Sequence, residues 1–183
     1  MNITHILVCL LLVAGFSVDS HAHDYSIIIK ISEQKLYLMN SNEVLKTYAV
    51  STSRYGIGSR IKSNKTPLGT HRIVQKIGEG APLGAIFDGK RRYTGKTSII
   101  YTDDTKLSEN YELTRIIWLE GMQPKINKGK GIDSFRRNIY IHGTAEEGLI
   151  GTPASIGCVR MKNSDVVELF NLVSIGMIVE IKE

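Results

Sequence analysis

The chain has 183 residues, 42% hydrophobic and 22% charged, which is the balance of an ordinary globular protein. This composition excludes a disordered chain, and the presence of only two cysteines excludes a disulfide-rich mini-protein. The length favours one domain with a sizeable core of its own. A formal net charge of +5 favours an anionic partner, such as nucleic acid, a membrane surface or an acidic polymer.

The first segment of the chain is typical of a secretory signal peptide. Residues 6–18 form an uncharged, largely apolar run of 13 residues, which is short for a membrane span of roughly 20. Small residues follow in Ser20-His21-Ala22, so we expect residues 1–22 to be removed after Ala22. A buried hydrophobic helix is the alternative. The signal predicts transient membrane targeting and a periplasmic or secreted protein, with residues 23–183 as its domain.

Removal of that segment would change the charge and the cysteine content. Asp19 and Cys9 would be lost, leaving 23 basic and 17 acidic side chains, a net charge of +6 and a single cysteine, Cys158. A lone cysteine cannot form an internal disulfide. Cys158 is therefore either an inert buried side chain or a nucleophile.

The remainder of the chain predicts a mostly β domain. The three N-terminal strands are expected to form an antiparallel meander. One helix is expected to begin at Asn163 or Ser164, either of which could cap it, and to run to about Val173. The predicted fold is a mixed β-sandwich or barrel with one or two short helices. The predicted strands are residues 25–31, 35–39, 44–50, 70–77, 97–101, 115–119, 138–141 and 177–181.

Two stretches, residues 55–64 and 78–96, are predicted to be long loops. Such loops often act as lids or binding loops, and a solvated surface excursion is the equal alternative. The second loop contains a basic cluster that could bind an anionic partner. Nucleic acid is not expected, because Tyr93 alone offers little aromatic stacking. The cluster consists of Lys90, Arg91, Arg92 and Lys96.

The candidate chemistry lies between residues 142 and 160. His142 ends an apolar strand and Cys158 follows a glycine-rich loop, so the imidazole could take the thiol proton. Gly157 would let a carbonyl approach, and its N–H and that of Cys158 could form an oxyanion hole. Arg160 could lower the thiol pKa or hold a carboxylate. The alternatives are that His142 is a core histidine, that Cys158 is a small buried hydrophobic side chain, and that Arg160 is a surface cation. No metal site is predicted, because the ligand spacing is lacking.

Three motifs together resemble a known family. His-Gly-Thr at 142–144 and Ser-Ile-Gly-Cys-Val-Arg-Met at 155–161 resemble the signature of the L,D-transpeptidase catalytic domain (YkuD-type). The segments KTPLGT at 65–70 and KLYLM at 35–39 are similar to further parts of that family. The resemblance covers roughly residues 25–181. Ile156 departs from it, because many members carry His or another polar residue there.

The resemblance implies an enzyme, without cofactor or metal, that acts on peptidoglycan stem peptides as donor and acceptor. Cys158 would attack the carbonyl of the third stem residue, release terminal D-alanine and leave a thioester. The product would depend on the acceptor that attacks this thioester. A second stem would give a cross-link, a lipoprotein lysine would give an anchor, and water would give the L,D-carboxypeptidase product. A non-catalytic wall-binding domain with an inert thiol is the remaining alternative.

The resemblance also implies roles for the residues around the nucleophile. His142 would be the base, oriented by the carbonyl of Gly143. Ser155 would support the site. Arg160 would be structural or would bind a stem carboxylate.

Overall fold

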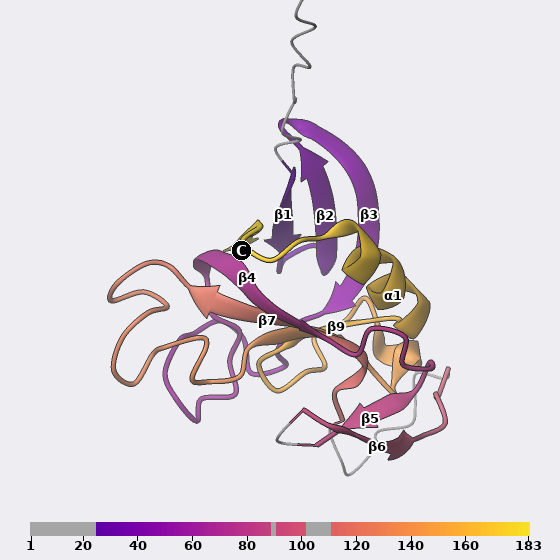
Figure 1. The fold of residues 1–183 in the computed structure, drawn as a ribbon. Helices are drawn as coiled ribbons and strands as arrows, with labels where there is room; N and C mark the ends of the chain where they lie inside the picture. The colour runs from indigo at the N-terminus through magenta and orange to yellow at the C-terminus, as the bar shows by residue number, and fades with distance from the viewer. Residues whose placement is uncertain (1–24, 89–90, 102–110) are drawn as a thin grey trace, which may run out of the picture.

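The computed structural model of the protein describes residues 25–88, 91–101 and 111–183 (Figure 1). The predicted signal segment with its cleavage after Ala22 lies outside these residues, as does Lys90 of the basic cluster. The strands are β1 (Tyr25–Lys30), β2 (Lys35–Asn40), β3 (Glu43–Ser51), β4 (Gly69–Ile77), β5 (Ala85–Phe87), β6 (Tyr93–Lys96), β7 (Leu113–Gly121), β8 (Tyr140–Gly143), β9 (Val159–Met161) and β10 (Ile178–Lys182). The helices are α1 (Asn163–Leu172) and a 3-10 turn (Glu147–Leu149).

A mixed sheet closes on itself into a barrel. Its strand order is β4-β10-β1-β2-β3-β9-β8-β7, and an additional pairing between β7 and β4 joins the two ends. Two neighbouring pairs, β1 with β10 and β8 with β9, are parallel, whereas the other pairs are antiparallel. The hairpin of β5 and β6 extends the sheet from β7. The predicted mostly β fold is thus confirmed as a barrel.

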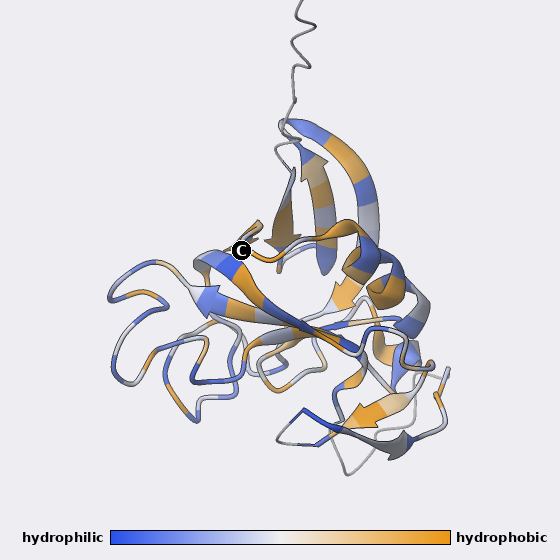
Figure 2. Cartoon of the chain, viewed as in Figure 1, coloured by the Kyte–Doolittle hydropathy of each residue, from blue (hydrophilic) through white to orange (hydrophobic). Residues whose placement is uncertain are grey.

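Apolar side chains fill two separate clusters. The larger one takes alternate residues of the barrel strands, such as Ile27 and Ile29 of β1, together with Val166 and Leu169 of α1. Figure 2 shows hydrophobic residues on both the strands and α1. The smaller cluster lies beneath β5 and is built from Ala85, Phe87, Ile116, Trp118 and Tyr140, with Cys158 packed against it. The thiol therefore lies apart from the main core.

Most elements occur where the sequence predicts them, including the N-terminal meander, and residues 55–64 form no regular element. The prediction of a strand at 97–101 is wrong: only Ile100 makes a bridge, with Glu146. The strand predicted at 138–141 begins later, at Tyr140. The loop predicted at 78–96 contains β5 and β6, and β9 was not predicted. Three- and four-residue strands are too short for alternation to identify them, and β propensity yields a strand only where a neighbouring strand pairs with it.

The single α-helix is confirmed, but its predicted cap is wrong. Lys162 occupies the N-cap position without a side-chain hydrogen bond to the helix, and Asn163 is the first helical residue. The Asn163 side chain instead bonds to the segment after β8, as described below. In the described part of the chain, no helix has the length and apolar character that crossing a membrane requires.

Candidate active site

Two parallel strands, β8 and β9, bring the candidate residues together. His142 is the register partner of Arg160, so both side chains lie on the same face of the sheet. Cys158 precedes Arg160 by two residues and shares that face. Val159 and Met161 alternate with them and enter the main core. The pairing thus puts His142 beside Arg160, which lies 18 positions further along the sequence.

His142 is fully buried and is held as a neutral imidazole. Its Nδ1 lies 2.7 Å from the carbonyl oxygen of Gly143. Burial, reinforced by the positive charge of Arg160, lowers the pKa of His142 to about 3, although the bond to Gly143 opposes the shift. A neutral ring donates Nδ1–H to that carbonyl and leaves Nε2 as an acceptor. Within the described part of the chain, Nε2 has no hydrogen-bond partner.

Cys158 is half-buried, and both hydrogen bonds of its sulfur go to the segment that leads into β8. The thiol donates to the carbonyl oxygen of Asn138 at 3.2 Å and accepts from the N–H of Tyr140 at 3.4 Å. Burial, followed by the negative charge of Glu112, raises the pKa of the thiol to about 12, whereas the Tyr140 N–H and the charge of Arg160 lower it. The resting group is a neutral thiol.

The turn before the nucleophile is fixed by one serine. The Ser155 hydroxyl donates to the Cys158 carbonyl oxygen at 2.6 Å and accepts the Gly157 N–H at 3.2 Å. Gly157 has φ +129°, a conformation that side chains rarely adopt. The expectation of a free Gly157 N–H is therefore wrong in this state, since Ser155 already accepts it. The Cys158 N–H is left as the candidate oxyanion donor.

Thr66, from the segment KTPLGT, braces the same turn from a distant part of the chain. This side chain is fully buried. Its hydroxyl donates to the Gly157 carbonyl oxygen at 3.0 Å and accepts the Ser53 N–H at 3.0 Å. The sequence singles out the segment but not this role, because the contact spans 91 residues.

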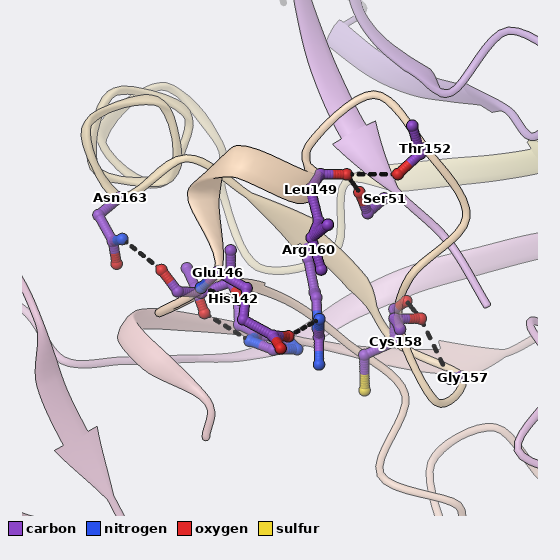
Figure 3. Close-up of polar contacts among 12 residues, drawn as sticks. Ser51, His142, Glu146, Leu149, Thr152, Gly157, Cys158, Arg160 and Asn163 are labelled. Carbon is purple, nitrogen blue, oxygen red and sulfur yellow. Dashed lines mark hydrogen bonds and ion pairs between the residues drawn. The ribbon is translucent and has the colours of Figure 1, made fainter. Parts of the chain in front are cut away.

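Arg160 is not a surface cation. Its Nη1 lies 2.6 Å from Oε2 of Glu146, and both side chains are nearly buried. Arg160 is also not among the residues that line the pocket beside Cys158. Figure 3 draws the Arg160 guanidinium between His142 and Cys158, and its positive charge acts to lower the pKa of both groups. Glu146 was not predicted as part of the site, and its only sequence signal is a position in the loop between His142 and Cys158.

Gly143 allows a close approach between β8 and the start of α1. A Cβ at this position would clash with Oδ1 of Asn163 and lie 2.8 Å from the Leu113 carbonyl oxygen. The Asn163 Nδ2 donates to the Thr144 carbonyl oxygen at 2.7 Å and to Oε1 of Glu147 at 2.7 Å. These bonds fix the chain directly after His142, and with it the carbonyl that orients the imidazole.

The thiol borders a pocket of about 200 Å³. Its walls combine apolar side chains with three cations, and none of its described lining residues is acidic. Arg137 is anchored, since it donates to the carbonyl oxygens of Gly58 at 3.2 Å and Lys65 at 2.5 Å. The predicted loop at 55–64 contributes to this wall, whereas the sequence did not point to Arg136 or Arg137. Besides Cys158, the lining residues are Ile61, Lys62, Asn64, Arg136, Arg137, Ile139 and Ile156.

The predicted basic cluster is not a continuous free patch. The Arg91 guanidinium lies 3.6 Å from the centre of the Trp118 ring and donates to the Tyr140 hydroxyl at 3.1 Å. Arg92 forms an ion pair with Asp88 at 2.8 Å. Both guanidinium groups thus already have partners, and binding of an anionic partner by this cluster stays a prediction.

Comparison with known proteins identifies the family. The family model of the L,D-transpeptidase catalytic domain (YkuD) matches residues 24–181. The chain belongs to this family. A putative L,D-transpeptidase, YkuD, of Bacillus subtilis (strain 168) is 26% identical over 160 residues, which are 86% of this chain and 66% of that protein.

Solved L,D-transpeptidase structures share the fold. One from Mycobacterium smegmatis has a TM-score of 0.54 at 15% identity and covers 88% of this chain and 59% of that one. The LD transpeptidase LdtMt1, solved in complex with imipenem, has a TM-score of 0.53 at 16% identity and covers 87% of this chain and 59% of that one. The chain thus spans less than two thirds of the length of these relatives.

Ile156 is the position at which the sequence leads us to expect a departure from many L,D-transpeptidase catalytic domains. This side chain is 38% exposed and lies on the wall of the Cys158 pocket. An apolar group there offers no hydrogen bond to a bound molecule. Among the described residues, no group of three or more His, Cys, Asp or Glu side chains is arranged to hold a metal ion.

Proposed function

We propose that this protein is an exported L,D-transpeptidase whose Cys158 forms a thioester with the third residue of a peptidoglycan stem peptide. One observation carries the proposal. Cys158 borders a pocket while His142, on the same face of the paired strands, keeps an unpartnered Nε2. A nucleophile on the same face as a base that is itself oriented by a third group supports covalent acyl transfer.

The first half-reaction moves one proton twice. The thiol leaves the Asn138 carbonyl, gives its proton to Nε2 of His142 and attacks the donor carbonyl carbon through Sγ. The Nδ1–H stays on the Gly143 carbonyl and keeps the ring oriented. The Cys158 N–H stabilises the oxyanion. Collapse of the tetrahedral intermediate breaks the C–N bond, and Nε2–H protonates the departing amine of D-alanine. The donor then remains on Cys158 as a thioester.

The second half-reaction reverses these steps. An acceptor amine gives a proton to Nε2 and attacks the thioester carbonyl, and the Cys158 thiolate leaves and recovers that proton. A second stem peptide would give a cross-link, and a lipoprotein lysine would give an anchor. Water in place of the amine gives the L,D-carboxypeptidase reaction, which uses the same residues.

The neutral resting pair makes proton transfer part of the attack. With a pKa of about 3 for His142 and about 12 for Cys158, an imidazolium–thiolate pair is disfavoured before substrate binds. The thiolate therefore forms only as sulfur approaches a carbonyl. This arrangement protects a lone exported thiol from oxidants, which react with thiolates.

Mass spectrometry of the intact protein tests the proposal. The full chain is produced as encoded and incubated with imipenem, beside Cys158→Ala and His142→Gln. We expect a one-to-one adduct on the native protein, none on Cys158→Ala and slow formation on His142→Gln. The untreated mass also shows whether residues 1–22 have been removed, which tests export.

Two other results would overturn the proposal in different ways. No adduct together with slow alkylation of the native thiol would favour the non-catalytic wall-binding domain. No adduct with fast alkylation would leave a reactive cysteine with a different substrate. If the adduct forms, stem peptides with and without an amine acceptor separate transpeptidation from hydrolysis.

A further inference from the structure

The wall of the Cys158 pocket carries positive charge that the steps above do not use. Lys62, Arg136 and Arg137 all line it, and none of its described lining residues is acidic. We propose that Lys62 and Arg136 bind the free carboxylate of the residue that leaves the donor peptide. This inference rests on the proposed function and transfers to these two residues the substrate-binding role that the sequence suggested for Arg160.

The three cations differ in what they already hold. Arg137 donates to two backbone carbonyl oxygens and so fixes the loop that ends at Thr66. Lys62 and Arg136 are exposed, and their side chains have no hydrogen-bond or ion-pair partner among the described residues. The carboxylate of the nearby Asp133 accepts the backbone N–H of Arg136 at 3.0 Å. Lys62 and Arg136 are therefore available to an anion.

The loop that presents Lys62 is held in an unfavourable conformation. Lys62 has φ +62° and Asn64 has φ +58°, both in the left-handed region that favours glycine. The Ile61 N–H bonds the Gly131 carbonyl oxygen at 2.7 Å, and the Ser63 hydroxyl bonds the Arg60 carbonyl oxygen at 2.6 Å. Strain of this kind persists where the surroundings enforce it, and it concentrates at ligand sites. The loop thus places Lys62 on the pocket wall at a conformational cost.

The chemistry of the wall matches a small amino acid with a free carboxylate. A guanidinium offers a planar fork to a carboxylate, and an ammonium adds a compact charge. Apolar Ile139 and Ile156 line the same pocket and can contact a methyl group. A volume of about 200 Å³ suits one small residue beside the reacting carbonyl. A donor that ends in an amide would leave both cations without an anion.

Two alkylating reagents of similar shape test the anion site without any substrate. Iodoacetate carries a carboxylate and iodoacetamide a neutral amide. Lys62→Gln/Arg136→Gln should slow iodoacetate labelling of Cys158 about fivefold or more, with little change for iodoacetamide, because the local positive potential attracts the anion. High salt should slow iodoacetate labelling of the native protein relative to iodoacetamide labelling, because salt screens the positive potential. Arg92→Gln, a cation outside the pocket, is the matched control and should change neither rate.

The same variants are then compared on stem peptides with a free and an amidated C-terminus. We expect kcat/KM to fall about tenfold or more for the free acid only, since charge-assisted bonds to the carboxylate are lost. Equal slowing of both alkylating reagents, or no slowing of either, would overturn the inference. If the iodoacetate preference holds but neither peptide reacts, the proposed function fails and the anion site stands. If both peptides react equally well, the function stands and the inference fails.

Discussion

Arg160 and Glu146 form an ion pair inside the protein, with 2.6 Å between Nη1 and Oε2 and side chains that are only 5% and 9% exposed. Arg160 lies on β9 directly beside His142 on β8. The pair therefore fixes a positive charge close to His142 and Cys158, where it acts to lower the pKa of both. A buried charge of this kind is tolerated only while its partner remains.

Glu146→Ala should strongly destabilise the protein. Removing one member of a buried ion pair leaves the other charge desolvated and costs about 3–5 kcal/mol. Urea denaturation measures this loss. Lys46→Ala breaks the ion pair with Glu168 at the surface, where both side chains are more than 40% exposed, and it should shift the midpoint much less. Equal shifts of the urea midpoint in the two variants would show that the buried ion pair contributes no more to stability than the surface pair.

Stability should decrease as the pH falls below about 6.5. Burial lowers the folded-state pKa of His142 to about 3 and of His71 to about 4, whereas both take up protons near 6.5 once unfolded. The stability that these two neutral rings contribute is fully present above pH 6.5. Near pH 5 the unfolded state binds about two more protons than the folded state. The slope of the free energy of unfolding against pH therefore corresponds to about two protons.

Urea denaturation between pH 7.5 and 5 measures the proton uptake, and carboxyl groups titrate mainly below that window. His71→Gln should remove about one proton from the slope. His71 has no part in the proposed chemistry, since its ring nitrogens lie 2.8 Å from the Gly69 carbonyl oxygen and 3.0 Å from the Ser134 hydroxyl. An unchanged slope in this variant would mean that His71 is not held neutral.

The sequence predicts the fold class well for a local reason, and the candidate nucleophile and base, which stay predictions, come from an equally local signal. Alternation along each strand is a short-range signal, and His142 and Cys158 lie within one short segment. The same alternation explains why Val159 enters the core while Arg160 does not. These features need no knowledge of distant contacts.

Several parts of the site were missed because they depend on distant contacts, and one because a nearby side chain turns back on the chain. Thr66 reaches Gly157 across 91 residues, and Lys62 joins the pocket from the same remote loop. The Gly157 N–H was expected to be free because nothing in the sequence shows that the Ser155 hydroxyl turns back to it. Local pattern identifies which residues can do chemistry, whereas tertiary contacts decide which of their groups remain available.

Thr66→Val should weaken the turn that carries Cys158. Valine keeps the shape of threonine but leaves the buried Ser53 N–H and Gly157 carbonyl without the hydroxyl, at a cost of about 1–3 kcal/mol. Acylation by imipenem should slow about tenfold as the Cys158 N–H moves from its place. Thr152→Val is the control, because that exposed hydroxyl donates to the nearby Leu149 carbonyl oxygen at 2.8 Å and no bond to the turn of Cys158 is seen among the described residues. Loss of stability without slower acylation would limit Thr66 to a structural role.

Arg91→Met should loosen the surroundings of the thiol. Arg91 stacks on Trp118 and donates to the side chains of Asn138 and Tyr140, whose backbone groups hold the Cys158 sulfur. Loss of the cation–π contact should lower the free energy of unfolding by about 1–2 kcal/mol.

Trp118 is the only tryptophan in the chain, so its emission in urea follows this part of the molecule directly. We also expect faster alkylation of Cys158 by iodoacetamide in Arg91→Met, since the thiol's hydrogen-bond partners lose their support. Arg92→Met is the matched control, because that side chain is 70% exposed and its ion pair within the described residues is with Asp88. If the two variants unfold at the same urea concentration and react at the same rate, Arg91 does not support the nucleophile. A difference in both measurements would connect the basic segment to the catalytic cysteine through contacts that already exist in the free protein.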